Sequence, residues 1–159
     1  MASGFASSFF DYDAPDGGGR ERSLTFLADR DERDWEVLLG YTQLRRFALG
    51  ETVMRRGERD RALYLLMTGT LQIRVDERAA TLKTIEAPSV VGELAFLDGG
   101  GRSVDLVAAS AGELRRLSMD AFEALSARYP ELGRAILFEL GRITSMRLHW
   151  MTDRVGHRE

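Results

Sequence analysis

The chain contains no cysteine and only two histidines among its 159 residues. Without cysteine, disulfide bonds, thiolate ligation of zinc or iron–sulfur clusters, and a cysteine nucleophile are excluded. His149 and His157 both lie near the C-terminus, so a metal centre built from several histidines is excluded as well. Carboxylates, arginines, hydroxyl groups and the backbone are therefore the groups available to a functional site.

The chain also lacks a large excess of charge of either sign and any long apolar run. It has 22 Lys and Arg against 25 Asp and Glu, a net charge of −3 at pH 7. This balance argues against a protein that holds nucleic acid on a broad cationic face. No apolar run approaches the about 18 residues that span a bilayer, and the start Met1–Gly4 has no basic signal segment. We therefore expect a soluble, cytoplasmic protein of one domain.

Residues 1–22 have the composition of a flexible tail. Gly17–Gly19 lie beside Pro15 and several aspartates, which are turn and linker residues. The segment also contains the aromatic residues Phe5, Phe9, Phe10 and Tyr12. Two interpretations of these residues stay open: they rest on the domain, or they dock on a partner. The domain itself is predicted over residues 23–159.

The hydrophobic pattern changes from helical to strand-like along the domain. From Ser23, apolar residues at three- and four-residue spacings predict a helical stretch that ends at Gly40. From about residue 41 to 118, short apolar runs separated by glycines predict a mainly β fold, a sandwich or barrel, with flanking helices. The runs are Leu63–Met67, Leu71–Val75, Leu82–Ile85, Ser103–Ala109 and Leu114–Leu117.

Helical spacing returns in two segments, about 119–129 and 130–153. Pro130 suits the first position of the second helix, because it lacks an N–H that would need a partner there. One apolar stripe of this helix is needed to pack on the β domain, and an adjacent second stripe predicts a homodimer through the helix. A single wide stripe against the domain is the alternative. The two stripes are Leu132, Ile136, Leu140 and Ile143, and Leu137, Leu148, Met151 and Val155.

One segment combines the polar groups that suit a ligand. Gly92-Glu93-Leu94-Ala95 is followed by three glycines and then by Arg102-Ser103. A helix start offers N–H groups to an anion, Arg102 offers a charged fork to phosphate, and Glu93 offers an acceptor to ribose hydroxyls. A plain ion pair between Glu93 and Arg102 is the structural alternative. The glycines allow close approach of the backbone to a ligand and favour a sugar-phosphate pocket.

This segment resembles the phosphate-binding cassette of cyclic nucleotide-binding domains. The resemblance covers residues 24 to about 150 and implies an eight-stranded, jelly-roll-like β-roll with N-terminal helices, a short cassette helix and two C-terminal helices. The β-roll is placed at about 41–118. The other matching segments are Phe47-x-x-Gly50-Glu51-Thr52-Val53 through Gly57, Leu63-Tyr64-Leu65-Leu66-x-x-Gly69, and the helix with Phe122.

The resemblance also implies roles for individual residues. Glu93 would accept the ribose 2′-hydroxyl, and Arg102 would pair with the exocyclic oxygens of the cyclic phosphate. Backbone amides around Leu94 and Ala95, after Gly92, would complete the phosphate cradle. Ser103 would contact the phosphate or a guanine edge. Strand alternation gives Ile73, Leu82 and Val91 as candidate base contacts, with ordinary core positions as the alternative.

The last helix is expected to supply a lid over the base. Thr144-Ser145 is similar to the pair that contacts adenine in catabolite activator-type members of the family. Alignment of the helix from Pro130 without gaps places Arg147-Leu148 there instead, so both registers stay open.

Two positions depart from the family pattern. Many cassettes have proline before the arginine, whereas this chain has Gly101, which predicts a less rigid loop. Asp105 is predicted on the same face as Ser103, where it would weaken phosphate binding, hold Arg102 in the empty site, or bind a base amino group. The sequence leaves these three roles open.

The function that follows is a non-catalytic sensor of a cyclic mononucleotide, cAMP in the first place and cGMP in the second. Movement of the C-terminal helix would signal to its own dimer or to an unidentified protein effector. Only residues 154–159 follow that helix, so no direct DNA binding, and no cofactor or metal beyond the ligand, is expected. The alternative is a dimerisation or docking module of the same fold that no longer responds to a mononucleotide or binds another nucleotide. A cupin-type enzyme is disfavoured, because the metal-binding histidine set is missing.

Overall fold

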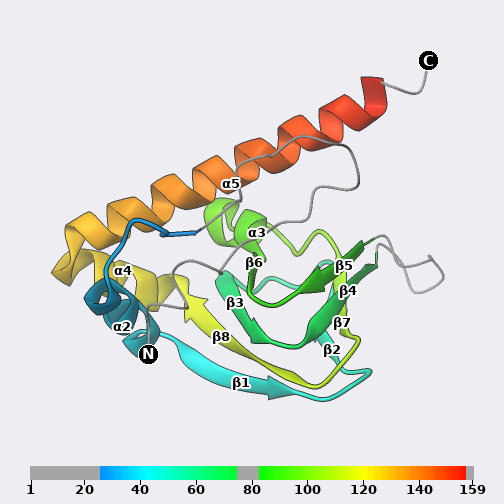
Figure 1. Cartoon of the computed structure of the whole chain (residues 1–159), viewed down its shortest axis with the longest axis horizontal. Coiled ribbons are helices and arrows are strands. Elements are labelled where there is room, and N and C mark those ends of the chain that lie inside the picture. Colours follow the sequence, from blue (N-terminus) through cyan, green and yellow to red (C-terminus); the bar gives the residue numbers. More distant parts are fainter. Residues whose placement is uncertain (1–25, 75–82, 157–159) are drawn as a thin grey trace.

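The computed structural model describes residues 26–74 and 83–156, so the predicted tail over residues 1–22 and the candidate base contact Leu82 lie outside the described part. Two four-stranded antiparallel sheets form a β-roll, and helices lie along one side and at one end of it (Figure 1). The predicted mainly β fold with eight strands and flanking helices is therefore confirmed.

The two sheets are built from strands that are far apart in the chain. In chain order the strands are β1 (Gln43–Phe47), β2 (Thr52–Met54), β3 (Ala62–Thr68), β4 (Thr70–Arg74), β5 (Lys83–Glu86), β6 (Ser89–Val91), β7 (Asp105–Ala108) and β8 (Gly112–Ser118). One sheet has the order β1-β8-β3-β6 and the other β2-β7-β4-β5. The five runs of the sequence overlap with β3, β4, β5, β7 and β8.

Strand β3 lies between two separate parts of the hydrophobic core. Leu63 and Leu65 pack with the helices, whereas Tyr64 and Leu66 pack with residues of the second sheet. All four side chains are buried. Because successive side chains of a strand point to opposite faces, a strand covered on both sides needs apolar residues at every position. The run of apolar residues in β3 has this cause.

The described helices are α2 (Glu32–Gly40), α3 (Glu93–Asp98), α4 (Met119–Arg128) and α5 (Pro130–Gly156). Figure 1 shows α2 and α4 at one end of the roll and α5 lying across α3, with its far end extending past the roll. The predicted C-terminal segments correspond to α4 and α5, and Pro130 opens α5. No helix in residues 26–74 or 83–156 is long and apolar enough to cross a membrane.

Helix α2 begins later than the sequence pattern predicts from Ser23. Asp31 caps its start, where the carboxylate accepts a hydrogen bond of 2.9 Å from the amide of Asp34. Leu27 has a φ of 55°, in the left-handed region, which ends any helical run before that cap. Leu27 is nevertheless buried. Leu27 therefore fits the apolar pattern because it is buried in a turn, not because it belongs to a helix.

Helix α5 packs on the domain through its predicted first stripe. Leu132, Ile136, Leu140 and Ile143 are all buried. Outside this stripe α5 carries three large apolar side chains that are exposed: Leu137 is 44% exposed, Phe138 73% and Leu148 64%. The domain thus buries one apolar stripe of α5, and large apolar side chains outside that stripe are exposed to solvent.

Candidate functional site

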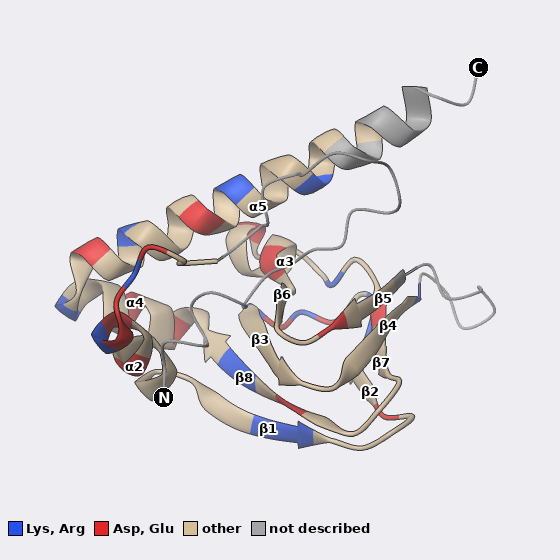
Figure 2. Ribbon diagram, in the orientation of Figure 1, with Lys and Arg blue, Asp and Glu red and all other residues tan. Residues whose placement is uncertain are grey.

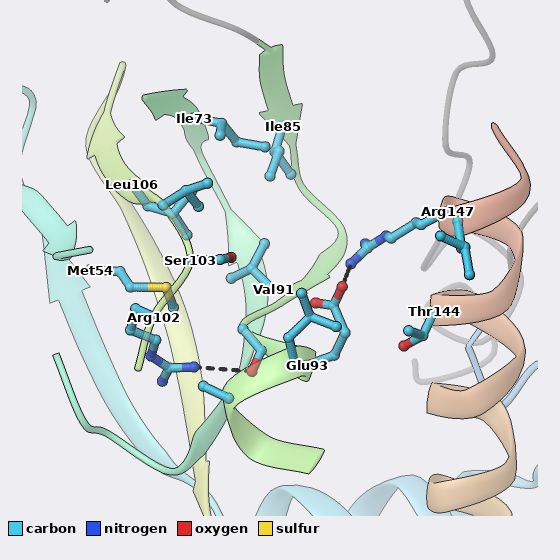
Figure 3. Close-up of a pocket in the computed structure, with 15 residues that line it drawn as sticks. Met54, Ile73, Ile85, Val91, Glu93, Arg102, Ser103, Leu106, Thr144 and Arg147 are labelled. Carbon is cyan, nitrogen blue, oxygen red and sulfur yellow. Dashed lines mark hydrogen bonds and ion pairs between the residues drawn. The ribbon is translucent and has the colours of Figure 1, made fainter. Parts of the chain in front are cut away.

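A pocket of about 470 Å³ lies between the second sheet, the short helix α3 and the last helix α5 (Figure 3). It brings together residues from both ends of the predicted cassette and from the predicted lid. Its lining consists of Met54, Ile73, Ile85, Val91, Gly92, Glu93, Leu94, Ala95, Arg102, Ser103, Val104, Leu106, Thr144, Arg147 and Leu148.

Helix α3 is only six residues long and depends on its surroundings for its position. At its C-terminal end, the Arg61 guanidinium donates hydrogen bonds of 3.0 Å to the carbonyls of Phe96 and Leu97. The Phe96 ring is buried and lies edge-on to Phe122 of α4, with 5.4 Å between ring centroids. Packing and hydrogen bonds thus fix the helix that carries Glu93.

Gly92, which precedes α3, has a backbone that only glycine adopts readily. Its φ is 79°, and a Cβ placed there would lie 2.5 Å from Nη1 of Arg102. Nη1 donates a hydrogen bond of 3.0 Å to the Gly92 carbonyl. Because Gly92 has no side chain, the Arg102 guanidinium can lie directly against the backbone at the start of the cassette.

Arg102 is held from both its backbone and its side chain. Its amide donates to the Glu58 carbonyl and its carbonyl accepts from the Gly57 amide, both at 2.8 Å. Nη2 donates to the Ala62 carbonyl at 2.8 Å, and the guanidinium lies 5.1 Å from the centroid of the Tyr64 ring. Nε is buried and has no hydrogen-bond partner among the described residues. A buried cation with one spare donor is therefore part of the pocket lining.

Asp60 connects Arg102 to a second arginine. Its Oδ2 accepts from the Tyr64 hydroxyl at 2.7 Å and lies 3.5 Å from Nη2 of Arg102, while Oδ1 accepts from Arg116 at 2.5 Å. Burial raises the pKa of Asp60, but the hydrogen bonds from Arg116 and Tyr64 and the charges of both arginines outweigh it and lower that pKa overall. Burial and the neighbouring carboxylate raise the pKa of Tyr64, so its hydroxyl stays a donor. Two guanidinium charges against one carboxylate leave the cluster positive.

Glu93 lies on the other side of the pocket and is bonded to the last helix. Its side chain is 10% exposed, and Oε1 accepts a hydrogen bond from Nη1 of Arg147 (Figure 3). Nη2 of Arg147 donates to the Val90 carbonyl at 3.1 Å. The residue predicted to accept a ribose hydroxyl is thus also the residue that joins α3 to α5.

The remaining wall of the pocket is apolar and comes from the roll. Ile73 and Val91, two of the three candidate base contacts, are part of the lining. Ile85 and Leu106 are further lining residues that the sequence reading did not select. Ile85 belongs to the same strand-like run as Leu82, but alternation places residues three positions apart on opposite faces, so the choice of Leu82 pointed away from Ile85.

The lid region contributes residues from both of the alternative registers. Thr144 lines the pocket, and its Oγ1 donates to the Leu140 carbonyl at 2.8 Å. Arg147 and Leu148 line it too, whereas Ser145 is exposed and is not part of the lining. An α-helix turns by about 100° per residue, so Thr144, Arg147 and Leu148 share a face that excludes Ser145.

The two departures from the family pattern have structural outcomes. Asp105 accepts a hydrogen bond of 2.6 Å from the Arg56 amide and does not line the pocket. It opens β7, whereas Ser103 precedes the strand, so simple alternation between them does not apply. A Cβ at Gly101 would lie 3.2 Å from the Gly57 carbonyl oxygen. The loop before Arg102 is therefore packed closely on the turn at Gly57.

The pocket offers binding groups rather than a metal centre. Among the residues that the structure describes, no group of three or more His, Asp or Glu is placed to hold a metal ion. What it offers is a buried cation, a carboxylate and an apolar wall, which suit a ligand with an anionic group, hydroxyl groups and a flat apolar part.

Comparison with known families identifies the class of domain. The profile of the cyclic nucleotide-binding domain matches residues 44–129, more than half of the chain. The chain therefore belongs to the cyclic nucleotide-binding domain family, in agreement with the resemblance of its cassette.

Two relatives of the chain are bacterial regulators. The chain is 35% identical over 101 residues to a CRP-like cAMP-activated global transcriptional regulator of Mycobacterium tuberculosis, which covers 60% of this chain and 44% of the relative. It is 28% identical over 110 residues to the cyclic AMP receptor protein of Thermus thermophilus, covering 67% and 51%. The chain thus spans about half the length of these curated relatives. A solved cyclic nucleotide-binding domain from Methylobacillus flagellatus has the same fold, with a TM-score of 0.73 and 21% identity over 99% of this chain and 86% of that one.

Proposed function

We propose that this domain is a non-catalytic sensor that binds a cyclic mononucleotide, with cAMP as the first candidate and cGMP as the second. The observation that carries this proposal is the convergence of Glu93 and Arg102 on one pocket of about 470 Å³. The two residues lie at opposite ends of the cassette, nine positions apart, and provide an acceptor and a cation. A volume of this size is in the range of small-molecule sites.

Each part of such a ligand has a partner in the pocket. The phosphate lies at the positive cluster, where Nε of Arg102 is the spare donor, with Ser103 and the amides of Leu94 and Ala95 nearby. The ribose 2′-hydroxyl donates to Glu93. The base packs on the apolar wall, which consists of Ile73, Ile85, Val91 and Leu106.

The preference for cAMP rests on two observations. Both curated relatives are named for cAMP. In addition, the hydroxyl of Thr144 donates to Leu140 and keeps lone pairs that can accept from the amino group of adenine. Guanine offers acceptors at O6 and N7, which would suit donors such as Arg147 instead. A titration with both ligands separates these cases.

The proposed signal passes from the cassette to the C-terminal helices. Helix α3 contacts α4 through Phe96 and Phe122, and it contacts α5 through Glu93 and Arg147. A ligand that moves the cassette therefore shifts the preferred position of both helices, provided that it binds one position more tightly. The output is a change in a homodimer formed through α5, or in the affinity for a protein effector that is not identified.

The alternative is a docking module of the same fold that does not respond to a mononucleotide. It is favoured by one observation: both Glu93 and the guanidinium of Arg102 already have hydrogen-bond partners within the chain. Under this alternative those bonds are structural. The sensor proposal requires instead that the groups also serve a ligand.

Isothermal titration calorimetry with cAMP, cGMP and linear AMP tests the proposal. We expect binding of a cyclic ligand, a loss of at least about tenfold in affinity for Glu93→Gln, and a larger loss for Arg102→Lys. An ammonium group cannot keep the guanidinium bonds to Gly92 and Ala62 and also offer a donor to the phosphate in the place of Nε. Arg134→Gln serves as the control, since Arg134 is 82% exposed and pairs only with its own helix neighbour Glu131 in the described contacts.

Thermal unfolding of each variant shows whether the fold is retained. Absence of heat with every cyclic nucleotide for the folded wild-type protein would contradict the sensor proposal and favour the docking module.

A further inference from the structure

Arg61 lies outside the pocket but is bonded to two of the helices beside it. It is exposed and does not belong to the pocket lining. Its Nε and Nη2 each donate a hydrogen bond of 3.0 Å, to the carbonyls of Phe96 and Leu97 near the end of α3. Its own carbonyl accepts from the amide of Met119, at the start of α4, at 3.0 Å. The described bonds of this exposed arginine are therefore all to backbone groups.

The end of α3 needs donors from outside the helix. The last carbonyls of a helix have no amide partner within it, and α3 is only six residues long. The Gly100 amide, which would continue the helix by bonding to the Phe96 carbonyl, donates instead to the Asp98 carboxylate at 2.7 Å. The carbonyls of Phe96 and Leu97 are thus left for the Arg61 guanidinium, which satisfies both.

The same guanidinium lies against the first residue of the glycine loop that leads to Arg102. A Cβ at Gly99 would lie 3.5 Å from Cζ of Arg61, which is ordinary van der Waals contact. This loop has Gly101 where many cassettes have proline, and for that reason the sequence predicts a less rigid loop. In the structure Arg61 supplies a restraint at the start of the loop.

Arg61 is itself attached to a firm part of the roll. It directly precedes β3, whose first residue Ala62 pairs with Ser118 of β8. The Ala62 carbonyl accepts from Nη2 of Arg102 at 2.8 Å, and Asp60, on the other side of Arg61, lies 3.5 Å from the same nitrogen. One segment of three residues therefore holds the guanidinium assigned to the phosphate with its outer residues, and the end of α3 with its middle residue.

We propose that Arg61 is a positioning residue of the ligand site: it fixes the orientation of α3, and with it Glu93 and the amides at the helix start, relative to the Arg102 guanidinium. This inference rests on the proposed function. The start of α3 is tied to Arg102 through the Gly92 carbonyl, and the buried Phe96 ring anchors its middle. The bonds from Arg61 fix the remaining end, so the spacing between the ribose and phosphate partners depends on a residue that touches neither group.

Positioning, charge and stability have different signatures in ligand binding. Loss of a positive charge near the pocket weakens ligands with the same phosphate equally, and loss of stability alone leaves the affinity of the folded protein unchanged. A displaced α3 instead reduces what the Glu93 carboxylate contributes. The ratio of Kd for 2′-deoxy-cAMP to Kd for cAMP measures this contribution, because the two ligands differ only in the 2′-hydroxyl.

The test compares Arg61→Met with wild type in the full chain, by competition against a fluorescent cyclic nucleotide. Methionine keeps an unbranched stem and removes the donors. We expect about tenfold weaker binding of cAMP, since a smaller fraction of the protein has a competent cassette, and a Kd ratio that falls by at least about threefold. Arg61→Lys keeps the charge without the planar fork and should lie between Arg61→Met and wild type.

Arg59→Met is the matched control, because it removes the same charge from the same turn. Arg59 is exposed, and its side chain has no hydrogen bond or ion pair among the residues that the structure describes. Its Kd ratio should equal that of wild type. Thermal unfolding shows whether each variant is folded, and Arg61→Lys takes the place of Arg61→Met in every comparison if the latter does not fold.

Hydrogen exchange gives a readout that needs no ligand. The amides of Gly99 and Gly100 donate to the Ala95 carbonyl and the Asp98 carboxylate at the end that Arg61 holds. We expect both amides to exchange at least about threefold faster in Arg61→Met than in wild type, and at the wild-type rate in Arg59→Met.

The failures of the two proposals are distinguishable. Wild-type affinity and ratio in folded Arg61→Met would overturn the role of Arg61 and leave the sensor intact. An equal loss for both ligands, matched by Arg59→Met, would reduce the role of Arg61 to charge and also overturn it, as would unchanged exchange at Gly99 and Gly100. Absence of cyclic nucleotide binding by the wild-type protein would overturn the sensor and, with it, the role of Arg61 in binding.

Discussion

At the scale of single residues, Asp60 shows how one carboxylate organises the cationic side of the pocket. It accepts hydrogen bonds from Tyr64 and Arg116 and lies beside Arg102, so it holds two guanidinium groups that would otherwise repel each other. Arg102 then keeps one donor for a ligand. The balance of this cluster depends on the ionised form of Asp60.

The stability contributed by Asp60 should therefore depend on pH. The folded state lowers its pKa, so the contribution is present above the unfolded value of about 3.9 and is lost as pH falls through the lower folded value. We expect Asp60→Asn to reduce the free energy of unfolding by about 1 kcal/mol at pH 7. Urea denaturation at pH 7, 5 and 3 should show the difference from wild type narrowing as pH falls.

Glu131→Gln is the matched control for this series, because the Glu131 side chain is 83% exposed. Its difference from wild type should be small at every pH. A deficit for Asp60→Asn that stays constant down to pH 3 would mean that the charge of Asp60 is not the stabilising feature.

Residue chemistry was the most predictable part of the site. Glu93, Arg102 and Ser103 were selected from residue type and spacing, and the structure places all three in one pocket. The bond between Glu93 and Arg147 was not foreseen. It joins residues 54 positions apart in the chain, and it depends on how α5 crosses α3, which local pattern does not encode. The same reason left the choice between Thr144 and Arg147 open at the sequence level.

At the scale of elements, helix α3 is the part of the fold that depends most on its neighbours. A helix of six residues has little stability of its own, and its entry through Gly92 requires a positive φ. That same glycine leaves room for the Arg102 guanidinium. One residue therefore sets both the helix start and the position of the cation.

Gly92→Ala should disturb both the start of α3 and the position of the Arg102 guanidinium. We expect a loss of about 1–3 kcal/mol in the free energy of unfolding, from the strained φ and the contact with Nη1, together with weaker binding of the cyclic nucleotide. Gly141→Ala is the control: it lies in α5, where a Cβ would meet nothing within 4 Å, and it should stabilise the helix by about 1 kcal/mol. Urea denaturation and calorimetry measure the two effects. Wild-type affinity in Gly92→Ala would show that the binding role of Arg102 does not depend on the space left by Gly92.

Elements with a clear repeat were predictable, and short ones were not. Strand β3 follows a continuous apolar run, β4 follows an alternating one, and α5 begins at the predicted Pro130. Strand β6 has three residues, all buried, which is too short for a period to be seen. Strand β1 is an edge strand of its sheet, and its Leu44 is 46% exposed, so its apolar residues do not mark a buried face. Pairing partners rather than local sequence define such strands.

At the scale of the whole molecule, charged residues lie in every described helix and in five of the eight strands (Figure 2). Three of the six large exposed apolar side chains among the described residues lie in α5. Leu137 and Phe138 lie outside the buried stripe of α5, and Leu148, also exposed, borders the pocket. A second copy of α5 has a complementary surface by symmetry. The dimer predicted from the sequence would use this face.

Phe138→Glu should separate such a dimer into monomers without unfolding it. The side chain is 73% exposed, so the change costs little in the monomer, but it places two charges face to face across a helix pair. Light scattering after size-exclusion chromatography measures the mass. Leu49→Glu, at a residue that is 72% exposed outside α5, should leave the mass unchanged. A wild-type monomer at all concentrations would exclude this dimer.

The length of α5 has a mechanical consequence. Its 27 residues span about 40 Å, at about 1.5 Å per residue, and Tyr129 at its start has a non-helical φ of −127° and ψ of 72° that forms a joint with α4. A rotation of about 10° at this joint would carry the position of Arg147 by about 4 Å, more than a hydrogen bond tolerates, and the far end by about 7 Å. A change at the pocket as small as the loss of one bond is thereby converted into a displacement large enough for a neighbouring protein to distinguish.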